Sequence, residues 1–443
     1  MRGAEVRSVG IDLGSKGHRA VLCDEGGGEV GRIDLGRGRR GLQALQEQAG
    51  GGEVLYIIEA AQNFWQELVH PLAAAGERVY LVNPTKCADL RKFYRRYVKT
   101  DTTDAQAIAR LAILDGKLRP AWVGTPEEES LKRLCRLSWK LTEEATNQKR
   151  RIAMLLEMVL PGIGEVWKNR TCASARLFYR RYLDPARARR LGRKRLAEML
   201  RRRAWGKFSP KAEEKLWRVI ENAPELRYRR DDLTLEIQNE LDGLESLEER
   251  NQRLRERIDE LYTEVDPNRR LESVPGLGPF LAAAITSVIG DISRWKNVSE
   301  LVASTGLVPR RRESSGKAKE NQPITQQGNP QFRCWLYVAA EIVRHYDPEL
   351  QAFFLRLRKR GLHHKAAICA VATKLLRRIY AVLHNQTEYR VTEDEKIRNG
   401  EKSVRHSVLE VAKTLLQEIQ DEAPLQSSGY PRSTQVTRPT GTA

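Results

Sequence analysis

The stretch that decides the fold is residues 6–35, which read VRSVGIDLGSKGHRAVLCDEGGGEVGRIDL. Its apolar and β-branched runs are separated by glycine-rich turns, and they predict strands over 6–13, 19–23 and 30–35. The connections between these strands are too short to hold a helix. The three strands are therefore expected to pair as antiparallel hairpins.

The chain continues as an alternation of helices and strands. The expected elements are a helix over 39–49, a strand over 53–58, a helix over 63–75, a strand over 78–82 and helices from 85 onward. Hairpins followed by this alternation predict a mixed sheet covered by helices. That order fits a ribonuclease-H-like α/β domain over 1–122 better than a doubly wound parallel sheet, because the first strands have no helices between them.

Four carboxylates stand at places that need an explanation. Asp12 interrupts the first apolar strand and Glu59 ends the apolar run of the fourth, where an unpaired charge is costly. Asp101 and Asp104 lie three apart on a predicted helix and share one side of it. Helix capping explains one of those two acids but neither strand acid. Oxygen ligands gathered at strand ends predict a site for Mg²⁺ or Mn²⁺ that serves phosphodiester chemistry.

A rival interpretation exists for the first strand. Residues 10–15, GIDLGS, are also similar to the first phosphate loop of actin-fold sugar kinases and chaperone ATPases. Those proteins need a second Asp-x-Gly-Gly loop in a second sheet domain. Residues 24–27 match it by letter but fall in the first hairpin, and the second half of the chain has a helical pattern. The ATPase interpretation is therefore disfavoured.

Composition restricts the partners. The chain has 443 residues and a net charge of +19, which points to a polyanion, most simply nucleic acid, rather than a merely basic protein. Its six cysteines lie far apart without a CxxC pair, which disfavours a zinc knuckle and fits free thiols in a reducing cytoplasm. Because it shows neither a signal peptide nor an 18-residue apolar stretch, we expect a soluble cytoplasmic protein without a membrane partner.

The middle region, 123–267, is helical and highly charged. Residues 176–204 carry twelve Lys or Arg against Asp184 and Glu198, with aromatic residues interleaved. This excess favours phosphate-backbone contact over an ordinary solvated helix face. The residues expected to make that contact are Arg193, Lys194, Arg195, Arg201, Arg202 and Arg203. The interleaved aromatic residues are Phe178, Tyr179, Tyr182 and Trp205.

A heptad repeat follows in residues 233–265. Its a positions are Ile237, Leu244, Asn251, Ile258 and Val265, and its d positions are Leu247, Leu254 and Leu261. This spacing predicts a coiled coil that pairs with the helix at 126–160 or with a second chain. A buried Asn251 can set the register of a pair, and an intrachain antiparallel pair would not need it. Pairing between chains is therefore favoured slightly.

The last compact region, 268–390, is expected to be α-rich. Residues 274–282, VPGLGPFLA, predict a helix-hairpin-helix turn in which Gly276 and Gly278 let backbone N–H groups approach a phosphate. A basic polar loop over 310–329 precedes a long helix. Its cations expected at nucleic acid are Arg310, Arg311, Arg312 and Lys317. Residues 391–443 are expected to form a helical extension and a disordered tail.

Two ordered sets of motifs resemble one protein family. Asp12, Glu59 and Lys99-Thr100-Asp101-Thr102-Thr103-Asp104-Ala105, with Pro84, resemble the DEDD, Holliday-resolvase-like domain of the one-ten family of insertion-sequence transposases. The Piv-type DNA invertases are kin of that family. Residues 275–278, 306–309, 314–317, 324–325 and 328–329 resemble its C-terminal transposase domain. The resemblance covers about 1–120 and 268–380.

The resemblance implies a DNA recombinase that combines a metal-bound DEDD site with a serine nucleophile. Ser315, directly before Gly316, is the expected nucleophile, and Ser314 is the alternative because the doubled serine leaves the register open. A phosphate-binding serine in a basic loop is the other explanation. Family members are guided by a structured bridge RNA that pairs with donor and target DNA. Assembly of the metals with a serine from another subunit implies a dimer or tetramer, associated with a bacterial or archaeal nucleoid.

Residues 160–225 depart from the family pattern, because they are longer and more basic than a plain coiled-coil linker. No RNA contact is carried over to them. Two other functions stay open: a junction-resolving, metal-dependent nuclease without a covalent intermediate, and a nucleic-acid-binding scaffold with a degenerate site. The presence of all four acids and the serine disfavours the scaffold. The serine loop separates the recombinase from the resolvase, which needs only the metal site.

Overall fold

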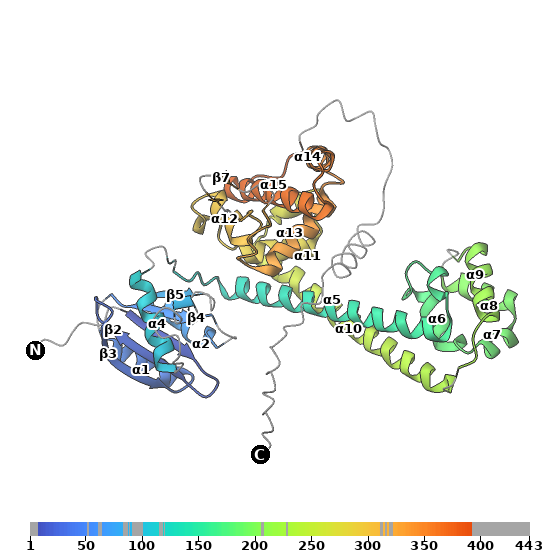
Figure 1. The fold of residues 1–443 in the computed structure, drawn as a ribbon, viewed down its shortest axis with the longest axis horizontal. Helices are drawn as coiled ribbons and strands as arrows, with labels where there is room; N and C mark the ends of the chain where they lie inside the picture. Colours follow the sequence, from blue (N-terminus) through green and yellow to red (C-terminus); the bar gives the residue numbers. More distant parts are fainter. Residues whose placement is uncertain are drawn as a thin grey trace, which may run out of the picture. The chain divides into compact units, whose positions relative to one another are not determined.

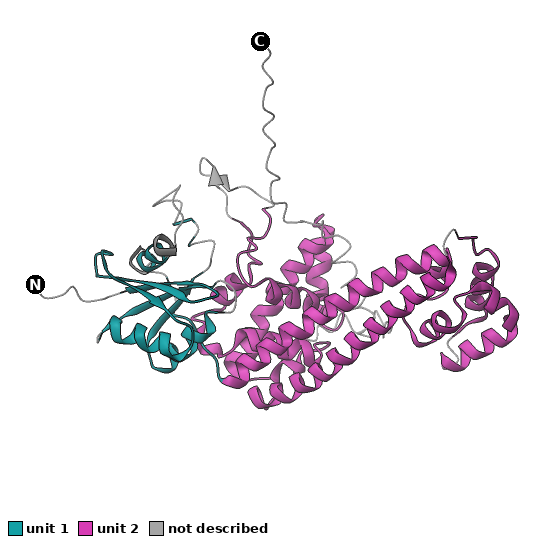
Figure 2. Ribbon diagram, turned by 90° about the horizontal axis from the view of Figure 1, so that it is seen from below, with its two compact units in different colours: residues 1–125 teal, residues 126–443 magenta. Residues whose placement is uncertain are grey.

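The computed structural model divides into two compact units, residues 1–125 and 126–443, which Figure 2 colours separately. It describes residues 8–50, 53–60, 64–82, 87, 89–90, 101–114, 118, 120–204, 208–226, 229–310, 313–314, 317–318 and 322–391. Nothing is described for the side chains of 101–104, 112–114, 313–314 and 317–318. In these ranges no helix is both long and apolar enough to cross a bilayer. Each unit is treated by itself below.

The first unit is built on a five-stranded mixed sheet (Figure 1). Its strands are β1 (Ser8–Leu13), β2 (His18–Cys23), β3 (Glu29–Leu35), β4 (Leu55–Glu59) and β5 (Arg78–Val82). They lie in the order β3-β2-β1-β4-β5, with antiparallel β1–β2 and β2–β3 pairs and parallel β1–β4 and β4–β5 pairs. The expected hairpins and mixed sheet are confirmed, and the arrangement is consistent with a ribonuclease-H-like domain.

Helices cover both faces of this sheet. Val9 and Ile11 of β1 pack into a core with α1 (Arg39–Ala49) and α2 (Gln66–Ala74). The opposite face carries α4 (Asp101–Leu114), whose Ala105 packs against β2. Side chains alternate between the faces of a strand, so Gly10 and Asp12 belong to the α4 face.

The second unit begins with a long antiparallel helical hairpin (Figure 1). Its arms are α5 (Pro126–Val159) and α10 (Arg230–Val265). Ser138 Oγ donates a hydrogen bond to Asn251 Oδ1 at 2.6 Å, and Asn251 Nδ2 donates to Thr142 Oγ1 at 3.0 Å. The inference that Asn251 favours pairing between two chains is therefore wrong, because its side-chain amide forms hydrogen bonds with α5 of the same chain. Oligomerisation itself stays a prediction.

In the described residues between the two arms, four helices and one short 3₁₀ turn connect the arms at their far end. They are η1 (Ile163–Glu165), α6 (Ala173–Tyr182), α7 (Pro185–Leu191), α8 (Arg193–Arg203) and α9 (Pro210–Glu221). We call residues 160–229 the tip module. Its core joins Trp167, Phe178 and Phe208 to Leu156 of α5 and Ile237 of α10. The tip module is thus a packed extension of the hairpin rather than a loose linker.

The opposite end of the hairpin packs into the C-terminal helices. These elements are η2 (Arg270–Ser273), α11 (Pro279–Ile289), η3 (Ile292–Arg294), α12 (Val298–Thr305), β6 (Glu313–Ser314), β7 (Lys317–Ala318), α13 (Pro330–Val343), α14 (Pro348–Lys359) and α15 (His364–Asn385). Trp139 of α5 meets Trp335 of α13 edge to face, with ring centroids 6.3 Å apart. The predicted tail lies outside the described residues, apart from Val391 at its start.

Candidate active site and nucleic-acid interface

Asp12 and Glu59 lie side by side at the carboxyl ends of two parallel strands. The β1–β4 register pairs Ile11 with Ile58, so the next residue of each strand is one of these two acids. Ile57 faces α4, because it packs against Ile108 and Leu111, and Glu59 therefore faces α4 as Asp12 does. Adjacent strands are about 4.8 Å apart. The two acids are therefore neighbours on one face of the sheet.

Gly10 lets α4 approach this part of the sheet closely. A Cβ atom at residue 10 would lie 2.1 Å from the Ala105 carbonyl oxygen and 2.3 Å from the Ala109 amide nitrogen. Both atoms belong to the helix backbone, so no side chain can swing aside to make room. Any other residue at this position would push α4 away from β1.

The direction of α4 brings its first turn toward the acids. Arg110 Nε donates to the Gly27 carbonyl at 3.0 Å, and Gly27 lies in the turn after β2, beside the amino end of β1. The helix therefore runs antiparallel to β1. The four residues from Ala105 back to Asp101 span about 6 Å of helix, and the two residues from Gly10 to Asp12 span about 6.6 Å of strand. The start of α4 is level with Asp12.

The arrangement fits a divalent metal. Glu59 is only 7 % exposed, and two neighbouring carboxylates on a helix-covered face are costly without a neutralising charge. The side chains of Asp101 and Asp104 are outside the described part of the chain. Among the side chains that are described, no group of three or more His, Cys, Asp or Glu residues could hold a metal ion. The backbone thus brings the positions of Asp12, Glu59 and Asp101 together at the carboxyl ends of β1 and β4. The fourth position, Asp104, is on the same helical turn as Asp101.

Sequence reasoning missed two sets of polar residues near this edge. Arg19 pairs with Asp12 across β1 and β2, and its Nε donates to Asp34 Oδ1 at 2.6 Å. This hydrogen bond is the main cause that lowers the pKa of Asp34. On the other face, buried His18 Nε2 lies 2.5 Å from Glu67 Oε1. The predicted hairpin brings these two strands together, but only its register, which pairs Leu13 with His18, places Arg19 opposite Asp12.

The base of the serine loop is well defined. Pro309 and Ile324 form an isolated antiparallel bridge, and the Arg310 amide donates to the Pro323 carbonyl at 2.8 Å. Further out, Ser314 of β6 pairs with Lys317 of β7. Ser315, Gly316, Arg311 and Arg312 lie outside the described residues. The motifs at 306–309 and 324–329, far apart in sequence, are thus neighbours that hold the two ends of the loop together.

Two glycines make this base possible. Gly306 has φ +69° and a Cβ there would lie 2.6 Å from the Gln327 carbonyl oxygen. Gly328 has φ +140° and a Cβ there would lie 2.1 Å from the Ser304 carbonyl oxygen. Backbone surrounds both positions, so glycine is required for conformation and for space. The loop therefore starts and ends on rigid backbone.

The glycines of the predicted hairpin turn have different surroundings. Gly276 has φ +84°, and a Cβ there would lie 2.5 Å from the Tyr346 ring. Close packing against that ring explains this glycine. Gly278 precedes α11, and nothing lies within 4 Å of the position of its Cβ. Gly278 is the one of the two with open space for a phosphate.

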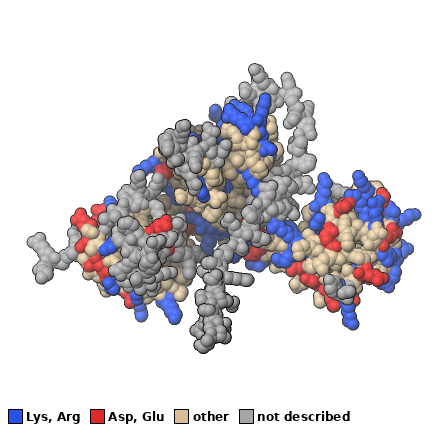
Figure 3. Space-filling view, viewed as in Figure 1, with Lys and Arg blue, Asp and Glu red and all other residues tan. Residues whose placement is uncertain are grey.

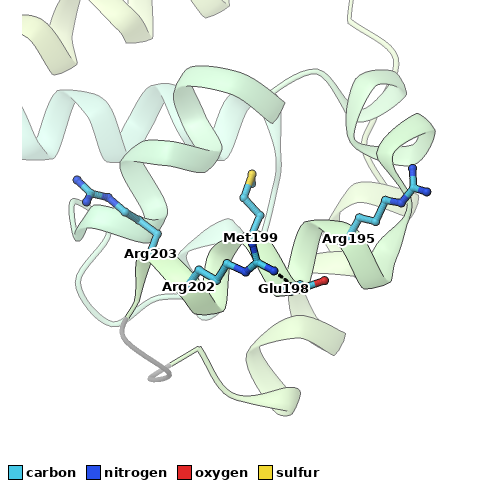
Figure 4. Close-up of a pocket in the computed structure, with 5 residues that line it drawn as sticks. All are labelled: Arg195, Glu198, Met199, Arg202 and Arg203. Atoms are coloured by element: carbon cyan, nitrogen blue, oxygen red, sulfur yellow. Dashed lines mark hydrogen bonds and ion pairs between the residues drawn. The ribbon is translucent and has the colours of Figure 1, made fainter.

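The basic residues of α8 divide into two groups. Arg193 and Arg201 both bond Glu213 of α9, and Arg202 bonds Glu198 within the helix. Among the described side chains, Lys194, Arg195 and Arg203 form no ion pair, and all three are exposed. A shallow pocket of about 450 Å³ lies along this helix. Figure 4 shows Arg195 and Arg203 extending away from the bonded Arg202–Glu198 pair.

The aromatic residues of this segment do not form a stacking surface. Phe178 and Tyr179 are fully buried, and both pack against Trp167, with ring centroids 5.8 Å away. Burial raises the pKa of Tyr179 well above its ordinary value. The expectation that these two rings serve nucleic acid was wrong, because they build the core of the tip module. Tyr182 is partly exposed beneath Arg187, and Trp205 lies outside the described residues.

Two family models match the chain. One, described as "Transposase", matches residues 9–161. The other, described as "Transposase IS116/IS110/IS902 family", matches residues 268–355. The first covers all four acids, and the second covers the serine loop, all of α13 and most of α14.

Curated relatives of this chain include proteins of insertion elements and a gene-inverting protein. The chain is 26 % identical over 323 residues to the "Insertion element IS116 uncharacterized 44.8 kDa protein" of Streptomyces clavuligerus, which covers 71 % of this chain and 78 % of that protein. It is 24 % identical over 335 residues to the "Pilin gene-inverting protein" of Moraxella lacunata, covering 75 % and 81 %. It is 32 % identical over 127 residues to the "Transposase for insertion sequence element IS1111A" of Coxiella burnetii, covering 28 % and 34 %.

Proposed function

We propose a mechanism for this chain that starts from its family: it belongs to the IS110/IS116 family of transposases and is therefore a DNA-cutting and rejoining enzyme. In this proposal it moves an insertion sequence with a divalent-metal site and a serine nucleophile. The observation that carries this proposal is the placement of Asp12 beside Glu59 on the face that α4 covers. Glu59 is 7 % exposed, and a sheet that only needed a core would have an apolar residue at this position.

The residues that would hold Mg²⁺ or Mn²⁺ are Asp12, Glu59, Asp101 and Asp104. When bound, such an ion activates an attacking oxygen and stabilises the leaving oxygen of a phosphodiester. The chain itself contributes the positions: strand register sets the first two acids, and the contact at Gly10 sets the helix that carries the other two. Arg19, which lies opposite Asp12 and bonds Asp34, would place a cation beside a phosphate bound at these acids.

The nucleophile in this proposal is Ser315, with Ser314 as the alternative. Attack of the Ser315 hydroxyl on a DNA phosphorus forms an Oγ–P bond, and the bond from phosphorus to one strand end breaks. The hydroxyl proton leaves to a base, since a neutral serine is a weak nucleophile. The β-bridge between Pro309 and Ile324 supports this role, because it joins the two ends of the serine loop and limits how far they can move.

Nucleic acid is bound in this proposal by cations on two parts of the second unit. Lys194, Arg195 and Arg203 of the tip module are exposed for backbone contact, and Gly278 offers an open helix start. Around the serine, the loop residues are Arg310, Arg311, Arg312 and Lys317. The substrates are donor and target DNA with a structured guide RNA. A dimer or tetramer brings the serine of one copy to the metal site of another.

The test is a search for the covalent intermediate. A stalled reaction run on a denaturing gel is expected to show a protein–DNA adduct that Ser315→Ala removes and Ser315→Cys partly restores. Loss of the adduct in Ser314→Ala alone would move the nucleophile by one residue. If the wild type forms no adduct under any stalling condition, the nucleophile is water at the metal site and the enzyme is a resolvase.

A further inference from the structure

The end of α14 carries a cluster of cations that has no role in the mechanism above. Between Glu349 and Glu388 the sequence contains eight Lys or Arg and no Asp or Glu. Five of the eight fall in residues 356–365, at the turn from α14 to α15. Figure 3 shows Lys and Arg side chains gathered over α14. We call Arg356, Lys359 and Arg360 the α14 patch.

The acids at the start of α14 are already paired with other cations. Arg378 Nη1 donates to Asp347 Oδ2 at 2.6 Å, and Lys374 Nζ donates to Glu349 Oε1 at 2.5 Å. In the described part of the chain, no carboxylate pairs with any residue of the α14 patch, and all three side chains are exposed. The charge of the patch is therefore available to an external anion.

The three cations share one side of the helix. Lys359 and Arg360 lie three and four residues after Arg356, the spacing that makes side chains neighbours on a helix surface. Like charges at this spacing repel one another and weaken the helix by a few tenths of a kcal/mol per pair. The helix dipole favours cations in this last turn of α14, but it does not account for three of them on one side of the helix without an acidic partner in the described part of the chain. An anionic partner accounts for all three.

Buried contacts hold the patch in place. The carboxylate of Glu341, near the end of α13, pairs with Arg344 and lies 3.7 Å from His364 Nε2. The Arg344 guanidinium stacks 4.3 Å above the Phe354 ring, and His364 meets the same ring edge to face at 5.4 Å. These contacts tie α14, the first turn of α15 and the end of α13 together. The cations are presented on a fixed platform instead of a loose loop.

We propose that the α14 patch binds the phosphate backbone of a nucleic-acid duplex, apart from the serine loop and from the tip module. The proposal rests on the proposed function only in that it expects a nucleic acid. DNA and RNA duplexes share this backbone chemistry, and the experiment below separates them. Binding needs neither cleavage nor metal, so a failure here is distinct from a failure of the recombination mechanism.

The test compares two triple variants of the full-length protein. One is Arg356→Gln, Lys359→Gln and Arg360→Gln. The matched control is Lys140→Gln, Arg218→Gln and Arg257→Gln, which removes the same charge from exposed helix positions that already have acidic partners. Fluorescence anisotropy with a 30-base-pair DNA duplex and with an RNA duplex of the same sequence, at 50 to 200 mM KCl, gives the slope of log K against log [KCl]. Circular dichroism checks that both variants are folded.

The expected result is a slope less negative by about 0.9 for each lost B-DNA phosphate contact, or about 2.7 for three. Over a fourfold change in salt, such a variant loses about 40-fold less affinity than the wild type. A reduced slope with DNA alone, or with RNA alone, supports the proposal and identifies the duplex. The proposal is overturned if the control variant shows an equal reduction, or if neither slope changes. If the slopes stay constant while self-association falls, the patch is a contact between copies.

Discussion

Replacing Gly10 with alanine tests how the site is assembled, since this glycine sets the distance between β1 and α4. The added Cβ would lie 2.1 Å from the Ala105 carbonyl oxygen, whereas ordinary van der Waals contact begins at 3.4 Å. The helix therefore has to retreat by about 1.3 Å, and overpacking of this kind costs about 1–3 kcal/mol of the free energy of unfolding.

The same retreat moves the start of α4 away from Asp12 and Glu59. A misplacement of about 1 Å at a reacting centre costs about 100-fold in rate. We therefore expect Gly10→Ala to lower recombination about 100-fold, even at a temperature where the protein is fully folded. Hydrogen–deuterium exchange of the peptide 101–114 should become faster, because the helix loses its close contact with the sheet.

Gly31→Ala is the matched control. It is the same substitution in the same sheet, and the added Cβ would meet only the Leu22 side chain, at 3.9 Å. Recombination and exchange of α4 should stay near wild type in this variant. The reasoning is refuted if Gly10→Ala recombines as well as Gly31→Ala and leaves the exchange of α4 unchanged.

Three further outcomes are expected. Asp12→Ala should abolish recombination in a folded protein and remove the stabilisation by Mn²⁺. In the wild type this stabilisation is about 2.7 kcal/mol when Mn²⁺ is present at 100 times its dissociation constant. A Mn²⁺-dependent rise in the melting temperature that survives in the variant would contradict the metal site. Asn251→Ala should lower the free energy of unfolding by about 1–3 kcal/mol, because buried Ser138 loses its hydrogen-bond partner. The control Gln252→Ala, at an exposed position of the same helix, should leave it unchanged. Equal urea midpoints of the two variants would contradict this. In α8, neutralising the unpaired cations should flatten the salt dependence of DNA binding more than neutralising the paired ones does, and equal effects would leave α8 an ordinary solvated face. The unpaired cations are Lys194, Arg195 and Arg203, and the paired ones are Arg193, Arg201 and Arg202.

Local sequence pattern was sufficient for the elements and for the unusual charges. Apolar runs separated by glycine-rich turns along 6–35 predicted three strands that the structure has within two residues at each end. The same kind of run marked Asp12 as a charge that interrupts a strand and Glu59 as a charge that ends one, where a lone charge is costly. Glycine-rich turns and the lack of a helix before residue 36 were enough for the hairpins. These features depend on neighbours within a few residues, and the sequence contains them directly.

What covers each buried face was decided only by the tertiary structure. The heptad of α10 is the same whether its partner is α5 or a second chain, and the hydrogen bonds of Asn251 to Ser138 and Thr142 identify α5. The aromatic rings of α6 have the composition of a stacking surface, yet they are buried.

The tertiary structure also decided which charges are paired and which acids lie next to one another. Glu213, on the next helix, pairs with Arg193 and Arg201 of α8 and leaves Lys194 and Arg195 to solvent. Asp12 and Glu59 are neighbours because two strands separated by more than forty residues pair in parallel, and the first turn of α4 lies near them because α4 runs antiparallel to β1. The physical reason is that the apolar face of an element is set by residues a few positions apart, whereas burial partners, register, direction and charge pairing belong to contacts between elements that are distant in sequence.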